Sequence, residues 1–218
     1  MSHLVIGEVS EFLRHTLWLG IKEDAVTSQL VTAEQNIVLT NPGQTNLPQG
    51  VVRQMSLWLY QVLPNEHLRN PSFVRRAEQP PPPAGGGPPP PVNDDVQFYP
   101  PLVLNLFYLL TPSIQADGGG ANDQIADQRL LGRAMQIFHD QAVMRMDSRQ
   151  NPGQADELHL SLATRTIEEL AEVWEAMQQP YRLSVCYEVR VVRIDSLRRV
   201  QGGRVTERAT EFAPVAEA

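Results

Sequence analysis

The chain has 218 residues, of which 42% are hydrophobic and 20% are charged, so it is long and apolar enough to bury a globular core. Its formal net charge of −7 argues against a protein that grips a nucleic-acid backbone, because such proteins usually carry a basic excess or stripe. Its single cysteine excludes an internal disulfide and fits a reducing cytosol.

The first quarter of the chain combines one helix signal with two strand signals. Apolar residues recur at helical spacing over residues 3–19, which predicts an amphipathic helix that ends at Gly20. Residues 37–39 predict a short strand, and the breaker-rich segment 40–50 predicts a loop. Residues 52–63 predict a strong strand. Because this strand is apolar on both faces, we expect it in the interior of a sheet, covered on each side.

A segment rich in proline and glycine follows at residues 79–92. Its two proline runs flank a glycine hinge and cannot pack as helix or sheet. One interpretation is a ligand for an aromatic-groove module, and the favoured one is a disordered insertion between two paired strands. Residues 100–112 predict the next strand, which matches residues 52–63 in length and apolarity, so we expect these two to pair.

The second half of the chain begins with a glycine-rich loop at residues 117–122. Residues 123–146 then predict a long helix, and Gly132 in its apolar stripe is expected to permit close contact with a neighbouring backbone. Residues 158–162 alternate as a strand does. Thr166 and Glu169 have the spacing of a capping box and predict a helix that runs to Met177.

From Tyr181 to Val191, every second residue is apolar and the residues between are mixed, which predicts that residues 181–195 form a long strand with one buried face. At roughly 3.3 Å per residue, this segment would span about 50 Å, against about 17–20 Å for a usual strand. Two alternatives stay open. The strand either leaves its own domain to reach another polypeptide, or it bends at a bulge and remains within its own sheet.

The C-terminal segment predicts a polar, protruding β-hairpin. Its arms are residues 197–200 and 205–212, joined by a tight turn at Gln201–Arg204, and a frayed tail follows. Taken together, the elements predict an α/β (α+β) fold with a mixed, largely antiparallel sheet and helices packed on it. We expect one domain over residues 1–196, which contains the insertion, and a hairpin with tail over residues 197–218.

No motif predicts a catalytic, cofactor or metal site. No two histidines have zinc-ligand spacing, and no phosphate-binding motif follows Gly118–Gly120. Cys186 lies in the middle of a strand, which favours a buried inert thiol over a nucleophile. An alternative from another class is a small hydrolase that uses Glu66–His67 or His139 with Cys186.

The sequence also predicts no membrane segment and no signal peptide. The most apolar stretch, Leu102–Leu110, has about nine residues, whereas a membrane helix needs about 20. The first residues lack a basic region followed by a long apolar run. We therefore expect a soluble protein that is made inside a cell.

Four segments occur in the same order in one known family: Leu57–Asn70, Pro100–Pro112, Leu130–Asp140 and Pro180–Asp195. Through them the chain resembles the tail-terminator, or cap, proteins of extracellular contractile injection systems, which are phage-tail-like particles of the antifeeding-prophage and virulence-cassette type. The resemblance covers roughly residues 3–196. The chain departs from the family by insertion, at the proline-rich segment and at the C-terminal hairpin.

The resemblance implies a structural protein with a tail-terminator-like fold, no cofactor and no catalytic turnover. It implies a homohexameric ring on the distal end of the inner tube and sheath, which ends polymerisation and anchors the last sheath layer. The partners would be other copies of the chain, the inner-tube protein and the sheath protein, with neither nucleic acid nor membrane. The chain would be synthesised in the bacterial cytoplasm, and the particle would be extracellular after release, or cell-associated. An adaptor or baseplate component of the same particle is the alternative.

A ring needs a heterologous interface, and a strand that outruns its domain can supply one by adding to a neighbour's sheet edge. We therefore predict that Val189–Asp195 and the hairpin beyond it contact a neighbouring subunit or the sheath. Mixed Arg and Glu side chains would set register more than affinity. The predicted interface residues are Val189, Arg190, Val191, Arg193, Asp195, Arg198, Arg199, Arg204 and Arg208.

Overall fold

The computed structural model describes residues 2–43, 53–68, 73–78, 93–112, 121–147 and 155–200. The chain divides into two compact units. The first unit comprises Met1–Pro71 and Pro101–Asp195, and the second comprises Ser72–Pro100 with Ser196–Ala218. Residues 72–100 thus join the C-terminal segment, although they lie within the stretch expected as one domain.

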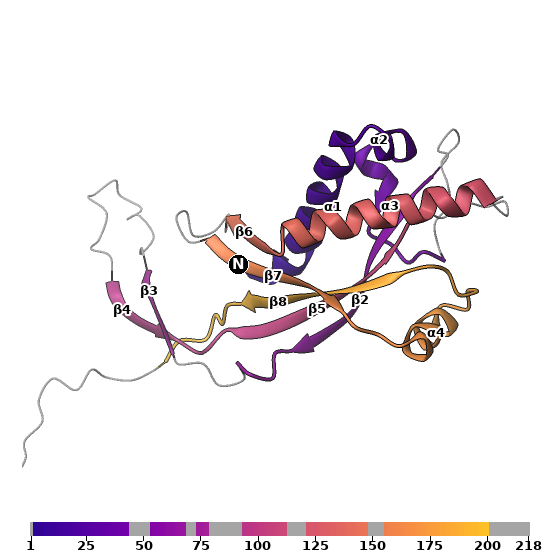
Figure 1. Ribbon diagram of the computed structural model, residues 1–218. Coiled ribbons are helices and arrows are strands. Elements are labelled where there is room, and N and C mark those ends of the chain that lie inside the picture. The colour runs from indigo at the N-terminus through magenta and orange to yellow at the C-terminus, as the bar shows by residue number, and fades with distance from the viewer. Residues whose placement is uncertain are drawn as a thin grey trace, which may run out of the picture. The chain divides into compact units, whose positions relative to one another are not determined.

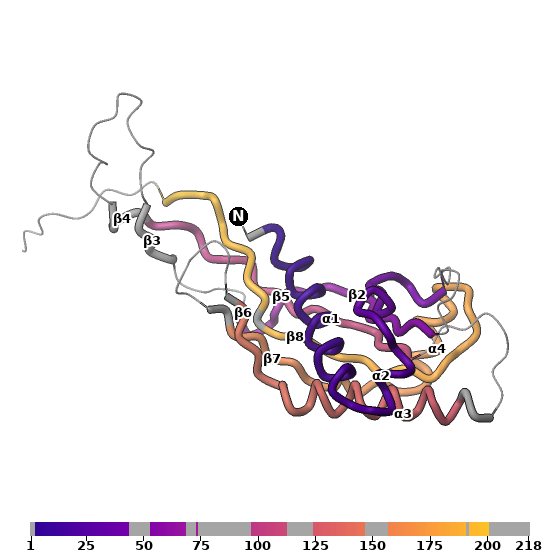
Figure 2. The backbone as a smooth tube through the Cα atoms, turned by 90° about the horizontal axis from the view of Figure 1, so that it is seen from above, coloured from indigo at the N-terminus to yellow at the C-terminus, as the bar shows by residue number. Residues whose placement is uncertain are grey.

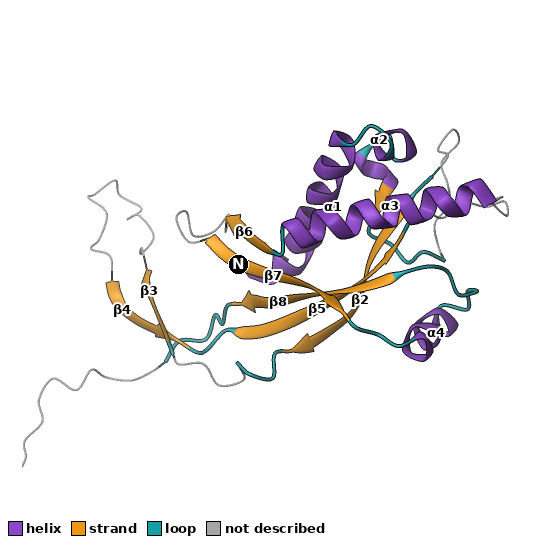
Figure 3. Ribbon diagram, in the orientation of Figure 1, coloured by secondary structure: helices purple, strands orange, loops and turns teal. Residues whose placement is uncertain are grey.

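Among the described residues, the first unit holds one mixed sheet and four α-helices, which are labelled in Figures 1 and 3. Its helices are α1 (Val5–Glu23), α2 (Thr27–Leu30), α3 (Ala121–Asp140) and α4 (Ile167–Ala176). Its strands are β1 (Ile37–Val38), β2 (Met55–Pro64), β5 (Leu102–Thr111), β6 (Val143–Asp147), β7 (Ala155–Ala163) and β8 (Val185–Ile194).

The strand order of this sheet is β1-β2-β5-β8-β7-β6. β1 runs parallel to β2, and every other neighbouring pair is antiparallel. The predicted mixed, largely antiparallel α/β fold is therefore confirmed. The predicted pairing of the two apolar strands is confirmed as well, because β2 pairs with β5 from Ser56↔Thr111 to Pro64↔Leu104.

The helices α1 and α3 cover one face of the sheet, which we call the core face (Figure 2). An apolar stripe of α1, from Val5 to Ile21, is buried against the inward side chains of the strands. The main strand residues of this core are Leu57, Leu104, Leu106, Tyr108, Leu110, Leu158, Leu160, Tyr187, Val189 and Val192. The burial of these side chains is the main stabilising contribution to the unit.

The close approach of the two long helices occurs at Gly20, and the predictions about Gly20 and Gly132 were wrong. A Cβ atom at Gly20 would lie 2.5 Å from Cγ1 of Ile137, so a larger residue there would force the Ile137 side chain to move. Arg133 Nη2 also donates to the Gly20 carbonyl oxygen at 2.8 Å. A Cβ atom at Gly132 would meet nothing within 4 Å. Because packing at Gly20 compensates for its weak helix propensity, α1 continues through it to Glu23.

The predicted helix over residues 123–146 was too long at its C-terminal end. α3 ends at Asp140, and Val143–Asp147 forms the strand β6. Met144 and Met146 are buried on the core face, whereas Val143 and Arg145 are exposed. Buried and exposed side chains thus alternate with the period of a strand, and β6 pairs with β7. This pairing overrides the helix propensity of the methionines.

The short helix α4 covers part of the opposite face, which we call the second face (Figure 1). Its predicted capping box is present, since Glu169 N–H donates to Thr166 Oγ1 at 3.3 Å and Thr166 N–H donates to Glu169 Oε2 at 2.9 Å. The fully buried Trp174 anchors the helix. Its ring packs with Leu109 and Cys186, and its Nε1–H donates to Ser184 Oγ at 3.1 Å.

The predicted long strand at residues 181–195 forms β8, which begins four residues later, at Val185. It lies between β5 and β7 in the middle of the sheet. Its pairing with β5 shifts between Val189↔Leu106 and Val192↔Leu104, so β8 carries one extra residue in this interval. Of the two alternatives, the bulged strand that remains in its own sheet is the one observed.

The second unit is built on a hairpin that the sequence did not predict. β3 (Val74–Glu78) pairs antiparallel with β4 (Asn93–Phe98), on either side of the proline-rich segment. Arg199 then forms a bridge to Phe98, and Tyr99 N–H donates to the Arg198 carbonyl oxygen at 2.9 Å. The proline-rich segment, the predicted turn and the second hairpin arm lie outside the described residues.

Candidate assembly surface

The most unusual feature of the first unit is the edge of β2. β1 pairs only with Met55 and Ser56, so among the described strands Leu57–Pro64 has a partner on one side alone, namely β5. No residue of β2 is charged. A long, uncharged edge with unpaired backbone groups is a template for pairing with another polypeptide. β2 was expected in the interior of the sheet. The sheet order places it between β1 and β5, but β1 pairs only with its first two residues.

Exposure rises along this edge. Met55–Leu57 are buried, and Gln61–Pro64 are exposed. Val62 and Leu63 are 40% and 41% exposed, and Leu102, in the adjacent strand β5, is 53% exposed. These apolar side chains lie beside backbone that has no strand partner on that side among the described residues, so a strand added to the edge would also cover apolar surface.

A bulge at Tyr60 sets which side chains of β2 face which way. Leu59 pairs with Tyr108 and Gln61 pairs with Phe107, so Tyr60 is the extra residue. Beyond the bulge, Gln61 lies on the second face, and Val62 lies on the core face opposite Leu106. The Tyr60 ring packs on the second face against Trp58 and Phe107, with ring centroids 6.2 and 6.4 Å apart.

A cavity of about 280 Å³ lies on the second face between β2 and α4. β2 lines it with Tyr60 and Gln61, and the α4 region lines it with Arg165, Glu169 and Glu172. Arg165 Nη1 lies 3.3 Å from Glu169 Oε1. The Arg165 guanidinium also stacks over the Phe107 ring, 5.5 Å from the centroid. The cavity therefore combines aromatic, carboxylate and guanidinium groups.

Burial raises the pKa of two groups at this cavity, the Tyr60 hydroxyl and the Cys186 thiol. Burial, and then the neighbouring Cys186 thiol, raise the pKa of Tyr60 to about 12. Burial likewise raises the pKa of the Cys186 thiol. Since the thiolate is the reactive form, a raised pKa makes Cys186 a poor nucleophile. This agrees with the interpretation of Cys186 as a buried inert thiol.

A chain of polar side chains crosses the second face from the end of β2 to β8. Asn65 Nδ2–H donates to Asn105 Oδ1, and Asn105 Nδ2–H donates to Glu188 Oε1, each at 2.9 Å. Glu188 Oε2 lies 2.7 Å from Nη2 of Arg190. Glu188 is only 8% exposed, so these partners compensate for burial of its charge. Its ion pair raises the pKa of Arg190 further.

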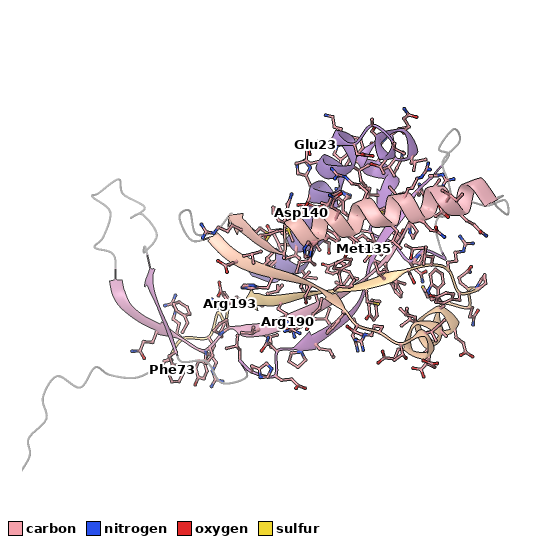
Figure 4. The ribbon with its side chains drawn as sticks, in the orientation of Figure 1. Glu23, Phe73, Met135, Asp140, Arg190 and Arg193 are labelled. Carbon is pink, nitrogen blue, oxygen red and sulfur yellow. The ribbon has the colours of Figure 1, made fainter. Side chains whose placement is uncertain are left out.

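The predicted interface residues are dispersed. Val189 is fully buried in the core, and Arg190 and Arg193 are exposed on β8 (Figure 4). Val191 lies in the same strand, and Asp195 is half-buried just beyond it. Arg198 and Arg199 belong to the second unit, where Arg198 lies 4.2 Å above the Tyr99 ring. Arg204 and Arg208 lie outside the described residues. A role for this set in contacts stays a prediction.

The residues weighed for hydrolysis are not brought together. His139 lies on α3, over the core face, whereas Cys186 lies on the second face. Glu66 and His67 lie in the exposed turn after β2. Over the described ranges, no three His, Cys, Asp or Glu residues are grouped as metal ligands would be. In the same part of the chain, no helix has the length and apolarity to span a bilayer.

The chain belongs to the family of the Pvc16 N-terminal domain, whose model matches residues 8–208. This match confirms the resemblance inferred from the four segments. No curated protein matches the sequence.

Two solved structures are similar. One is the PVC sheath/tube terminator of an extracellular contractile injection system in its extended state, with 13% identity and a TM-score of 0.46. The other is the tube-terminating cap of the anti-feeding prophage, with 16% identity and a TM-score of 0.48. The matches cover 91% and 86% of this chain, which spans 64% and 59% of theirs.

Proposed function

We propose that the protein is a structural cap, or tail terminator, of a contractile injection particle. It forms a ring on the distal end of the inner tube and sheath, ends their polymerisation, and anchors the last sheath layer to the tube. Membership of the Pvc16 N-terminal domain family supports this function. The structural observation that carries it is the long, uncharged edge of β2, which is unpaired within the described sheet.

A sheet edge suits this task for a physical reason. Main-chain hydrogen bonds along an edge give affinity and a fixed direction, and a closed ring requires a contact between two different patches on each subunit. A catalytic role fits the described residues poorly, because the candidate acid, histidine and thiol groups lie on different faces. We therefore propose a protein that assembles and does not turn over a substrate.

Deletion of the gene tests the proposed function. We expect particles without the cap to vary in length, with sheath and tube ending at different positions, as seen by electron microscopy. Particles of uniform length, with sheath and tube ending together, would overturn the proposal. Labelling the protein in intact particles separates a cap from an adaptor or baseplate component, since the label would mark the distal end for a cap.

Arg190 and Arg193 test the predicted contact of β8 with a neighbouring subunit or the sheath. The double variant Arg190→Glu/Arg193→Glu should lose attachment of the chain to particles, because reversed charges repel the complementary surface. Since Arg190 is also the ion-pair partner of the buried Glu188, some loss of stability is expected as well, and thermal unfolding establishes that the variant is folded before attachment is compared. The matched control is Lys22→Glu/Arg129→Glu, which reverses two exposed cations on α1 and α3. Attachment that survives in the first variant would remove Arg190 and Arg193 from the interface.

A further inference from the structure

The sheet of the first unit ends in two different edges, and both lie open among the described strands. At one end, Leu57–Pro64 of β2 pairs only with β5. At the other end, β6 pairs only with β7. One copy can therefore offer the edge of β6 to a second copy, and the second copy can offer the edge of β2. This is the requirement for a head-to-tail contact between copies.

We infer that β6 of one copy adds to the free edge of β2 in the next copy, with Arg145 seated in the cavity beside Tyr60 and Gln61. The partner is a second copy of this chain. The inference rests on the proposed function in one respect, namely that copies meet head to tail in a ring. It adds the two strands, their direction and the side chain that sets the register.

The direction of pairing follows from the topology. β2, β5, β8, β7 and β6 alternate in direction, so the fifth strand, β6, runs the same way as β2. A rotation that carries the sheet of one copy into line with the next preserves strand direction. The added strand is therefore parallel to β2. β1 already pairs in parallel with Met55 and Ser56. The added β6 would continue this parallel pairing along the rest of β2.

The register follows from matching the faces. Arg145 lies on the second face, between the core residues Met144 and Met146. Placing Arg145 opposite Gln61 puts Met146 opposite Val62, and both of these side chains lie on the core face. The 40% exposed Val62 then gains an apolar neighbour. A shift by one residue would put charge on the core side, so register is specified by the pattern itself.

The chemistry of the cavity suits an arginine. Leu170 and Val173 of α4 line it and can pack against the aliphatic stem of the side chain. Glu169 is occupied by Arg165, whereas Glu172 makes no ion pair within the part of the chain that the structure describes. Arg145 is exposed, and its cross-strand neighbour Glu157 lies 3.2 Å from His159 Nε2. Glu172 of one copy and Arg145 of the next are thus complementary charges.

Disulfide cross-linking within assembled particles tests the strand pairing. Neighbouring strands lie about 4.8 Å apart, within the Cα separation of about 4.4–6.8 Å that disulfides span. The double variant Gln61→Cys/Arg145→Cys should give, on oxidation, a ladder of covalent oligomers. Each single variant and the natural chain, whose Cys186 is buried, should give none. Absence of the ladder, or a dimer from Gln61→Cys alone, would overturn the pairing.

Charge exchange tests the seating of Arg145. Arg145→Glu and Glu172→Arg should each lower the amount of chain retained on purified particles, by about tenfold. The combined variant should recover most of it. Glu175→Arg, on the same helix but away from the cavity, is the matched control and should retain the natural amount. Failure of the combined variant to recover would overturn the Arg145–Glu172 contact.

The two proposals fail in different ways. Uniform particles that require the chain, combined with no cross-link, would overturn the β2–β6 contact and leave the cap function standing. Particles that remain uniform without the gene would overturn the cap function. Thermal unfolding of each purified variant excludes misfolding as the cause, since all the substituted side chains are at least partly exposed.

Discussion

β2 and β8 are both ten-residue, mostly apolar strands of the same sheet, yet their surroundings differ. β8 has β5 on one side, and from Cys186 to Arg190 it has β7 on the other. β2 has β5 on one side, and beyond Ser56 it has no second strand among those described. Both carry a bulge. In β8 the bulge bends a central strand, and in β2 it turns Tyr60 toward a cavity at the edge.

The difference shows that strand composition does not determine position in a sheet. Two apolar faces are usual for a central strand, and β2 has them because α1 covers one face and α4 covers part of the other. Among the described strands, its second neighbour is β1, which is only two residues long and leaves the rest of β2 without a partner on that side. The same change made in both strands should therefore affect stability in one and assembly in the other.

The largest effect should come from Val189→Asp in β8. Val189 is fully buried and lies between two strands, so the variant places an unpaired carboxylate in the core. We expect the free energy of unfolding to fall by about 3–5 kcal/mol or more. Urea unfolding followed by circular dichroism measures this. A stable Val189→Asp protein would show that β8 is not the central strand described.

The sequence was sufficient for the elements whose local signals agree with their packing. The alternation at residues 158–162, the capping box of Thr166 and Glu169, and the pairing of two matched apolar strands were predicted and are observed. It was insufficient where tertiary contacts decide. Gly20 stays helical because Ile137 packs onto it, and Val143–Asp147 leaves the helical pattern because β7 offers a partner.

The candidate surface was hidden from the sequence for the same reason. A strand lies at an edge when its neighbour is short or lacking, and the sequence of residues 55–64 does not indicate that β1 has only two residues. The prediction centred on β8 because its unbroken alternation appeared too long for one sheet. β8 is shorter than predicted because it begins only at Val185, and a bulge at which it carries one residue more than β5 keeps it paired within the unit.

The second-largest effect on stability should come from the hydrogen-bonded polar side chains of the second face. Glu188→Ala removes the acceptor of Asn105 and the ion-pair partner of Arg190. Because Glu188 is almost fully buried, we expect a loss of about 1–3 kcal/mol in the free energy of unfolding. Glu188→Gln keeps an acceptor for Asn105 and should lose less. Equal losses in the two variants would contradict this account.

A third, smaller effect concerns α4, which packs on both β2 and β8. Thr166→Ala removes the N-cap acceptor and should lower stability by about 1 kcal/mol. The matched control is Thr164→Ala, which changes an exposed threonine outside the helix and should stay within about 0.5 kcal/mol of the natural chain. Equal stability in the two variants would show that the capping box is not formed in solution.

The smallest effect on folding should come from Val62→Asp, the same substitution as in β8 but placed on the β2 edge. Val62 is 40% exposed, so its carboxylate would remain hydrated in the isolated chain. We expect a change in the free energy of unfolding of less than about 1 kcal/mol. In the assembled particle, however, a strand added by a neighbouring copy would bury this carboxylate among apolar side chains.

Val62→Asp should therefore abolish retention of the chain on purified particles, although the chain folds normally. Val26→Asp is the matched control, because Val26 is 50% exposed and lies in a turn away from both sheet edges. That control should fold and be retained as the natural chain is. If Val62→Asp is also retained, the edge of β2 faces solvent in the particle, and assembly depends on another surface, of which the exposed arginines of β8 are the first to test.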